Sequence, residues 1–246
     1  MCRHLAYLGS PVRIGALLID APHSLRRQAY APRLMHWGHE NHDGWGVAWY
    51  EPDRAEPMHY RTVVSLQHDR GFAAAGQVAS SLLAAVRLAS PGLALERDNT
   101  APFVRGSIAF SLNGYGFADG REPRLRAALP RARAEQLEGD TDTEVLFALV
   151  LERLESGLAA NEALRDVTTL AEPDGSVRLN LLLTDGNRIT ATTWGNSLFT
   201  RSSGPAVVVA SEPLDDEPGW TRVPDRSLVD AAPGTVTITS LEMSSR

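Results

Sequence analysis

Short apolar stretches alternate along the chain with loops rich in Gly, Pro and Asp. This pattern is typical of β-strands. Asp185 and Gly186 separate two such runs and form a strong turn signal, which favours antiparallel pairing. The predicted strands are Arg3–Leu8, Gly46–Tyr50, His59–Val64, Leu82–Arg87, Ser107–Asn113, Val177–Thr184, Arg188–Trp194, Ala206–Ala210 and Thr235–Ser240.

Helical periodicity marks a smaller part of the chain. It predicts helices over Asp69–Ser80, Asp142–Ser156 and Asn161–Leu170, with one or two helical turns at Ile14–Ile19. The helix from Asp142 has the clearest signal, because Thr141 and Glu144 form a capping box and a broad apolar face follows. No Pro/Gly/Ser-rich linker and no internal repeat divides the chain. We therefore predict one α+β domain over residues 1–246, with helices on the outer faces of antiparallel sheets.

Composition removes several classes of function. The 246 residues include 43% hydrophobic residues, enough for a full core. The formal charge of −6 argues against a nucleic-acid binder. The chain contains no lysine, so Schiff-base chemistry, pyridoxal-phosphate chemistry and a Walker-type phosphate loop are excluded. No secretory signal and no run of 18 apolar residues is present, so we expect a cytoplasmic protein that does not bind membranes.

The single cysteine, Cys2, directly follows Met1. Removal of Met1 would place a thiol and a free α-amine on one residue, and an N-terminal amine can activate such a nucleophile. Its reference pKa of about 8 leaves a useful fraction neutral at cellular pH. The alternative is a small apolar residue that packs at the edge of the first strand. Because small residues at position 2 generally permit methionine removal, we expect Met1 to be cleaved.

Histidines offer two weaker hypotheses. His4 is near Cys2 in sequence and would share its face of a strand only if the strand starts at once, so we rank it below the α-amine as the base. His36, His39 and His42, with Asp43, invite a metal site, but Gly38 and the turn residues that follow would break a helix there. We therefore rank this metal site low.

A series of motifs in a fixed order carries a family resemblance. After MCRHLAYLG at the start come NHDGWGVAWY (41–50), AAVRLAS (84–90), NTAPF (99–103), SLNGYG (111–116), GDTDTEVLF (139–147) and ASEPL (210–214). Together they resemble the class II glutamine amidotransferases, which are N-terminal-nucleophile hydrolases. The resemblance spans residues 1–215. It implies a four-layer αββα sandwich of two antiparallel sheets, in agreement with the α+β prediction.

The resemblance also implies the catalytic groups. Cys2 would be the nucleophile, and the oxyanion hole would consist of the Asn113 side-chain amide and the Gly114 backbone N–H. From the residues alone a hairpin turn at Asn113-Gly114 would be favoured, whereas the series of motifs favours the oxyanion hole. In this family Asn41, Asp43, Gly44 and Gly46 lie in the segment that lines the floor of the site; from the residues they predict a turn into a buried strand, with no direct chemistry.

The substrate-binding residues follow in the same way. Arg87 matches the family arginine that binds the α-carboxylate of a γ-glutamyl group, and Asp142 matches the aspartate that binds its α-ammonium. Taken alone, Arg87 is a common strand-end arginine and Asp142 a favoured first-turn residue of a helix. Ala101 stands where the family often has a histidine. The family also often has a threonine at a position near Ser90. Both Ala101 and Ser90 lie beside the expected substrate site, so they bear on whether free glutamine is the substrate.

The resemblance implies hydrolysis of a γ-glutamyl amide through a cysteine thioester. The chain looks most like stand-alone members that begin MCRHL and contain DGWG and APF, which act in ergothioneine biosynthesis and release glutamate from γ-glutamyl-hercynylcysteine sulfoxide; we expect this reaction here. The resemblance implies that the reaction needs no metal and no organic cofactor. One alternative is a glutaminase that delivers ammonia to a separate synthase partner. Another is a catalytically silent γ-glutamyl-binding protein. The sequence leaves open the identity of the leaving amine, which loops recognise it (31–39 and 213–220 are candidates) and whether the protein forms a homodimer.

Overall fold

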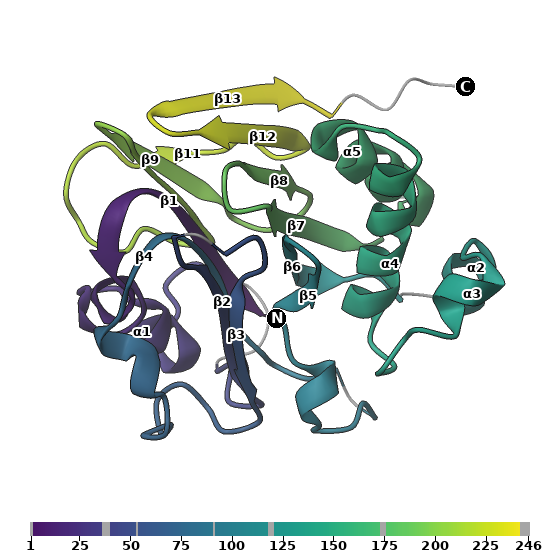
Figure 1. Cartoon of the computed structure of the whole chain (residues 1–246), viewed down its shortest axis with the longest axis horizontal. Coiled ribbons are helices and arrows are strands. Elements are labelled where there is room, and N and C mark those ends of the chain that lie inside the picture. The colour runs from purple at the N-terminus through teal and green to yellow at the C-terminus, as the bar shows by residue number, and fades with distance from the viewer. Residues whose placement is uncertain are drawn as a thin grey trace.

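The computed structural model describes residues 2–35, 40–52, 54–90, 92–117, 121–172 and 176–241. Two antiparallel sheets lie face to face (Figure 1). The first has the strand order β11-β9-β10-β1-β4-β2-β3 and the second has the order β13-β12-β8-β7-β6-β5. The strands are β1 (Arg3–Arg13), β2 (Trp45–Tyr50), β3 (Met58–Thr62), β4 (Val78–Val86), β5 (Phe103–Arg105), β6 (Ile108–Tyr115), β7 (Arg178–Thr184), β8 (Ile189–Thr193), β9 (Phe199–Ser203), β10 (Ala206–Ala210), β11 (Thr221–Arg222), β12 (Ser227–Ala232) and β13 (Thr235–Ser240).

Helices cover both outer faces. On the first sheet lie the short turns η1 (Ala16–Asp20) and α1 (Leu25–Tyr30), and on the second lie α4 (Asp142–Glu155) and α5 (Ala160–Ala171) (Figure 1). The remaining short helices are η2 (Ala73–Gly76), η3 (Arg97–Asn99), α2 (Glu122–Ala127) and α3 (Arg131–Ala134). The predicted four-layer αββα sandwich is confirmed. None of the helices in the described segments is long and apolar enough to cross a membrane.

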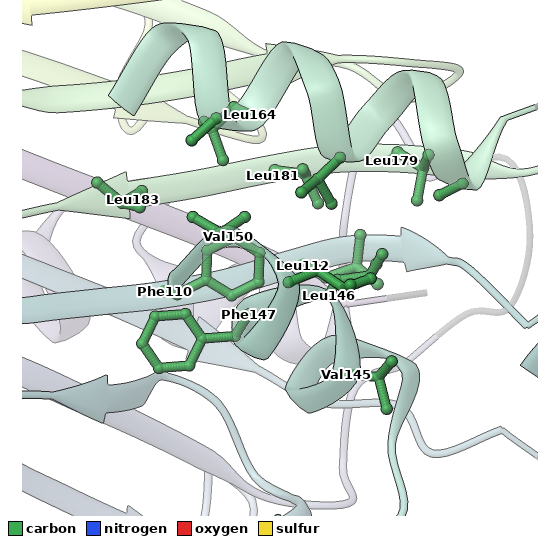
Figure 2. Packing of buried hydrophobic residues seen from close by; sticks show 14 of the residues in the cluster. Phe110, Leu112, Val145, Leu146, Phe147, Val150, Leu164, Leu179, Leu181 and Leu183 are labelled. Atoms are coloured by element: carbon green, nitrogen blue, oxygen red, sulfur yellow. The ribbon is translucent and has the colours of Figure 1, made fainter. Parts of the chain in front are cut away.

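Strand alternation divides the core into layers. On β6, Phe110 and Leu112 point toward α4, where Phe110 stacks on Phe147 with 5.2 Å between ring centroids. Figure 2 shows these side chains with Val150 and with leucines of β7. The alternate β6 residue Ala109 belongs to a second apolar cluster between the two sheets. The same strand therefore supplies both the helix-facing layer and the layer between the sheets.

The predicted helix over Asp69–Ser80 is wrong. Only the turn η2 forms there, and β4 starts at Val78 because Val78 and Ala79 pair with the end of β1. The carboxylate of Asp69 accepts hydrogen bonds from the indole of Trp45, the hydroxyl of Tyr60 and the N–H of Gly71, so it ties a loop to the core. Helical propensity in this alanine-rich segment yields to strand pairing and to these tertiary contacts.

The helices α4 and α5 are confirmed within one residue at each end. The capping box is half right. The Thr141 hydroxyl accepts a hydrogen bond from the Glu144 N–H at 3.2 Å, as predicted. The Glu144 carboxylate instead accepts from the backbone N–H groups of Glu138 and Gly139, at 2.7 and 2.8 Å. It therefore fixes the loop that leads into α4.

All of the predicted strands form, and four further strands were missed. Two of them, β5 and β11, have only three and two residues, too few to show alternation. The sequence of β9, FTRSS, is largely polar, and that of β12 contains Asp230. Both are strands because they pair with neighbours: β9 with β10 and β11, and β12 with β8 and β13. The hairpin at Asp185 is antiparallel, as predicted.

Candidate active site

The nucleophile candidate lies at the mouth of the layer between the sheets. Cys2 is half-buried and directly precedes β1, with its Sγ 4.0 Å from the carbonyl oxygen of Leu88. Further along β1, Ala6 and Leu8 belong to the cluster between the sheets, so even-numbered residues of this strand face the second sheet. Cys2 continues that face at the open end of the strand.

The facing strand β6 brings Asn113 to the same end. Nδ1 of His4 lies 3.0 Å from the Ser111 hydroxyl, which joins the two sheets at that level. Ala109, two residues before Ser111, belongs to the apolar cluster with Ala6. Because both strands alternate with period two, Asn113 lies one step beyond Ser111, at the level of Cys2.

Five of the six predicted site residues line one cavity. Cys2, Arg87, Ser90, Gly114 and Asp142 surround it, and its remaining lining comes from Ala85, Val86, Leu88, Ala89, Leu93, Asn99, Ala101, Leu112, Thr141 and Thr143. The cavity with its mouth has a volume of about 490 Å³.

Arg87 supplies a buried positive charge. Arg87 is 6% exposed. Its Nη2 donates to the carbonyl oxygen of Ala94 at 3.2 Å, whereas its Nη1 is buried without a hydrogen-bond partner. Among the described residues no carboxylate forms an ion pair with it. A buried guanidinium with an unused donor at a cavity wall is suited to bind an anion, because the anion accepts that hydrogen bond and compensates the buried charge.

Asp142 supplies the opposite charge. Its Oδ2 accepts from the Gly116 N–H and its Oδ1 from the Thr143 N–H, each at 2.7 Å. Burial raises the pKa of this carboxyl above its usual value, and the hydrogen bonds and the Arg87 charge act in the opposite direction. The Asp142 carboxylate thus lies fixed at the start of α4, with Arg87 and Cys2 around the same cavity.

Asn113 and Gly114 lie inside β6, so the hairpin-turn alternative is wrong. Only glycine fits at position 114, because a Cβ there would lie 1.8 Å from the carbonyl oxygen of Arg178 on β7. Asn113 is fully buried and does not itself line the cavity. Its Nδ2 donates to the Ser211 hydroxyl at 3.2 Å, and its Oδ1 has no partner.

His4 is a poor candidate for the base. Burial, and to a smaller extent the charge of Arg3, lower its pKa to about 3. Its Nδ1 is already bonded to Ser111. The metal hypothesis gains no support, because no group of three metal-ligating side chains occurs among the described residues. His36 and His39 lie outside the described residues; the exposed ring of His42 lies 3.5 Å from Asp43.

Residues without direct chemistry hold the site in place. The turn predicted at residues 41–46 is present, with Gly44 at φ +121°. The Asp43 N–H donates to the Arg87 carbonyl, the Arg87 N–H donates to the Gly44 carbonyl, and the Asp43 carboxylate accepts from the Ala89 N–H at 2.8 Å. This turn therefore fixes the backbone that carries Arg87, a role the sequence did not reveal.

A buried ion pair between Arg3 and Glu212 holds the backbone next to the nucleophile. Nε of Arg3 donates to Glu212 at 3.0 Å, and both side chains are inaccessible to solvent. Arg3 also donates to the carbonyl oxygen of Cys2 at 3.4 Å, while Glu212 accepts from the backbone N–H groups of Arg33 and Leu34. The motif ASEPL marked this segment, but only the tertiary structure shows that Glu212 reaches the residue after Cys2.

The two segments expected to recognise the leaving amine do not reach the cavity in the part of the chain described. Residues 31–35 and 213–220 contribute no lining residue, and residues 36–39 lie outside the described residues. Instead, the two segments contact each other through the ion pair between Arg33 and Asp216 at 2.9 Å.

Comparison with known proteins places this arrangement in a family. Residues 24–202 match the model of the family described as "Glutamine amidotransferases class-II". The chain belongs to the class II glutamine amidotransferases. The glutamine phosphoribosylpyrophosphate amidotransferase of B. subtilis has the same fold, with a TM-score of 0.70 and 14% identity over 98% of this chain and 50% of that one. The sandwich of this amidotransferase domain is thus the N-terminal-nucleophile hydrolase fold.

Two curated relatives align with nearly the whole of this chain. A γ-glutamyl-hercynylcysteine sulfoxide hydrolase of Mycobacterium tuberculosis is 39% identical over 98% of this chain and 97% of its own. The protein of the same name from Mycolicibacterium smegmatis is 37% identical over 98% of this chain and 100% of its own. Both relatives carry the name of a hydrolase that acts on a γ-glutamyl compound.

Proposed function

We propose that this protein hydrolyses γ-glutamyl amide bonds, with Cys2 as the nucleophile. The observation that carries the proposal is the convergence of Cys2, Arg87, Asp142 and Gly114 on one cavity, although they come from four separate parts of the chain. A γ-glutamyl group has a carboxylate and an ammonium at one end and the reacting carbonyl at the other. The cavity offers a cation, an anion and a thiol around one shared space.

The charges define the bound orientation. The unused Nη1 of Arg87 binds the substrate α-carboxylate, and Asp142 binds the α-ammonium. Binding an ammonium stabilises the ionised form of Asp142, whose pKa burial raises in the free protein. Ser90 contributes to the wall of the same cavity. With its amino-acid end held, the substrate presents its γ-carbonyl to Cys2.

The first half-reaction forms a thioester. After removal of Met1, the α-amine of Cys2 accepts the thiol proton, and the thiolate attacks the γ-carbonyl carbon. A C–S bond forms, and the carbonyl π electrons move to oxygen, where the Gly114 N–H and the Asn113 amide stabilise the negative charge. The tetrahedral intermediate collapses, the C–N bond breaks, and the leaving amine takes a proton from the α-ammonium.

The second half-reaction consumes water. The neutral α-amine accepts a proton from a water molecule, which attacks the thioester carbonyl carbon through the same oxyanion hole. The C–S bond then breaks, glutamate leaves, and the Cys2 thiol is restored with the proton held by the amine. Every proton transfer uses Cys2 or water, so the proposed sequence needs no metal and no organic cofactor.

We propose γ-glutamyl-hercynylcysteine sulfoxide as the substrate, with glutamate and hercynylcysteine sulfoxide as products. Two relatives named for hydrolysis of this compound support it, because each is at least 37% identical over nearly the whole chain. The expected setting is ergothioneine biosynthesis in the cytoplasm. The single-domain organisation stays a prediction, the homodimer stays untested, and a synthase partner belongs only to the alternative of an ammonia-delivering glutaminase.

The test is release of glutamate by the purified protein and by Cys2→Ala, with γ-glutamyl-hercynylcysteine sulfoxide, glutamine and glutathione offered separately. We expect release mainly from the sulfoxide and a loss of at least 10⁴-fold in Cys2→Ala, because the nucleophile is absent. Intact-mass spectrometry should show that Met1 has been removed.

Each other outcome has a meaning. Release mainly from glutamine would favour the ammonia-delivering glutaminase. No release from any compound, with Met1 retained, would favour the silent γ-glutamyl-binding protein. Activity that survives in Cys2→Ala would overturn the mechanism itself. Arg13→Met, at an exposed ion pair with Asp20, is a matched control that should leave every rate unchanged.

A further inference from the structure

The buried hydrogen bonds around Asn113 leave two groups unsatisfied. The Ser211 hydroxyl oxygen accepts from the His4 backbone N–H at 3.0 Å and from Asn113 Nδ2 at 3.2 Å. With both neighbours donating, the Ser211 hydroxyl proton has no acceptor in the described part of the chain. The Asn113 Oδ1 is buried without a partner. Asn113 thus carries an unpaired acceptor and its neighbour Ser211 an unused donor. Leaving both groups without a hydrogen bond in a dry interior costs free energy.

A half-turn of the Asn113 amide about its Cβ–Cγ bond satisfies both groups. The half-turn exchanges Oδ1 and Nδ2, which are similar in size and shape. Ser211 can then donate its hydroxyl proton to Oδ1 while still accepting from the His4 N–H. Nδ2 takes the position that Oδ1 held, as a donor with no protein partner. A free donor is what an oxyanion requires and what a lone acceptor cannot provide.

We propose that Ser211 is a positioning residue: its hydroxyl donates to Asn113 Oδ1 and so holds Nδ2 toward the oxyanion formed on the Cys2 adduct. This inference rests on the proposed function, because it assigns Ser211 a role in that reaction. Ser211 is suited to the task because its backbone is fixed. Its N–H donates to the His4 carbonyl and its carbonyl accepts from the Ser197 hydroxyl, at 2.9 and 2.8 Å.

The backbone of Asn113 is held independently. Its carbonyl accepts from Nδ2 of Asn196 at 2.9 Å, and β6 pairs with β7 on both sides of it. Rotation of the side-chain amide is therefore the main freedom left to Asn113. A hydrogen bond from the Ser211 hydroxyl to Oδ1 favours the orientation that leaves Nδ2 free as a donor.

The decisive experiment is a double-mutant cycle on glutamate release from γ-glutamyl-hercynylcysteine sulfoxide. We expect Ser211→Ala to lower kcat by about 10-fold or more, with KM little changed, whereas Asn113→Ala should cost about 10²–10³-fold as a lost oxyanion donor. Because Ser211 acts through Asn113, adding Ser211→Ala to Asn113→Ala should have no further effect. Independent losses that multiply would overturn the proposal.

A second readout separates positioning from general damage. Alkylation of Cys2 by iodoacetamide forms a C–S bond and expels iodide, without any oxyanion. Its rate should be the same in wild type and Ser211→Ala; an equal fall in alkylation and hydrolysis would show that Ser211 only supports the local structure. Ser211→Thr keeps the hydroxyl and should restore hydrolysis, and failure to do so would count against the hydrogen bond.

Two further proteins complete the design. Ser156→Ala removes an exposed serine hydroxyl, which donates to the Arg153 carbonyl at the end of α4, so kcat should stay within about twofold. Ser211→Cys is similar in shape with a weaker donor; it carries the test if Ser211→Ala is recovered unfolded, and should give an intermediate kcat. If wild type releases no glutamate, the proposed function itself fails; if wild type is active and Ser211→Ala keeps its full kcat, only the Ser211 inference fails.

Discussion

The two ends of the layer between the sheets differ sharply, although the same strands build both. At one end Ala6 and Leu8 of β1 and Ala109 of β6 belong to an apolar cluster. Two residues before Ala6 in β1 and two residues after Ala109 in β6, the side chains of His4 and Ser111 form a buried hydrogen bond. The layer thus changes from apolar to polar within one strand repeat, and Cys2 and Asn113 lie at the polar end.

The apolar end mainly contributes to the stability of the fold, and the polar end mainly fixes the geometry of the site. Small apolar side chains let the sheets approach, and their contacts do not depend strongly on direction. The polar end is less favourable for stability, because some of its buried groups, such as Nε2 of His4, have no partner. Hydrogen bonds there are directional, so they fix the groups around the thiol. Substitutions at the two ends should therefore change different measured quantities.

Leu83→Ala, at the apolar end, should have the largest effect on stability. Leu83 pairs with Ala6 and is fully buried between the sheets. Loss of its contacts and the resulting cavity should lower the free energy of unfolding by about 2–5 kcal/mol. Urea unfolding measures the loss, and kcat per folded molecule should stay within about twofold. A fall in kcat comparable to that of a site variant would show that the two ends are not independent.

Arg87→Met, at the polar end, should show the reverse pattern. Loss of the charged hydrogen bonds to the substrate carboxylate should reduce kcat/KM by about 10²-fold, mainly through KM. The free energy of unfolding should be unchanged or higher, because a buried guanidinium with an unused donor disappears. An unchanged KM would remove Arg87 from the proposed substrate site.

His4 should make the stability of the polar end depend on pH. Burial lowers its pKa to about 3, against about 6.5 in the unfolded chain. Between these values the unfolded chain binds a proton that the folded chain does not. Stability should therefore fall as pH falls from about 6.5 toward 3, by up to about 1.4 kcal/mol per pH unit from this residue.

Urea unfolding at several pH values measures this slope. His59, whose pKa burial lowers to about 4, adds to the slope with the same sign, so the total alone does not isolate His4. The comparison with His4→Asn does, because this variant keeps a polar group and removes the titration. Equal slopes in wild type and His4→Asn would show that His4 does not contribute.

Asp142 should affect substrate binding in the acid range. Because burial raises its pKa, the carboxyl takes up a proton at a higher pH than an ordinary aspartate. The protonated form does not hold an ammonium, so KM should rise about tenfold for each pH unit below that pKa. In Arg87→Met the rise should begin at higher pH, because the Arg87 charge opposes protonation. Measurement of KM from pH 4 to 8 tests both points, and a KM independent of pH would contradict them.

Long periodic segments and ordered motifs were predictable. The apolar face of α4 and the apolar runs of β1, β6 and β7 depend on local sequence alone, and these elements formed as expected. The helix over Asp69–Ser80 failed because pairing of Val78 and Ala79 with β1 is a contact distant in sequence. The strands β9 and β12 were missed for the same reason.

The site shows the same division. Six residues were found by the order of their motifs, and five of them meet at one cavity. The supports were not found, because Asp43, Glu212 and Ser211 act through backbone groups and buried partners far away in sequence. A carboxylate or hydroxyl in a loop has no local signature for such a role.

By itself, the sequence determined which chemical groups this protein possesses: one thiol at position 2, no lysine, an Asn-Gly pair, and an arginine and an aspartate in recognisable settings. It also determined the period of its main elements, since that depends on neighbouring residues. Only the tertiary structure decided that the two sheets close over His4 and Ser111 and that Arg87 remains without an acidic partner among the described residues. Those outcomes depend on contacts between residues about a hundred positions apart, and burial then sets their charge and hydrogen bonding.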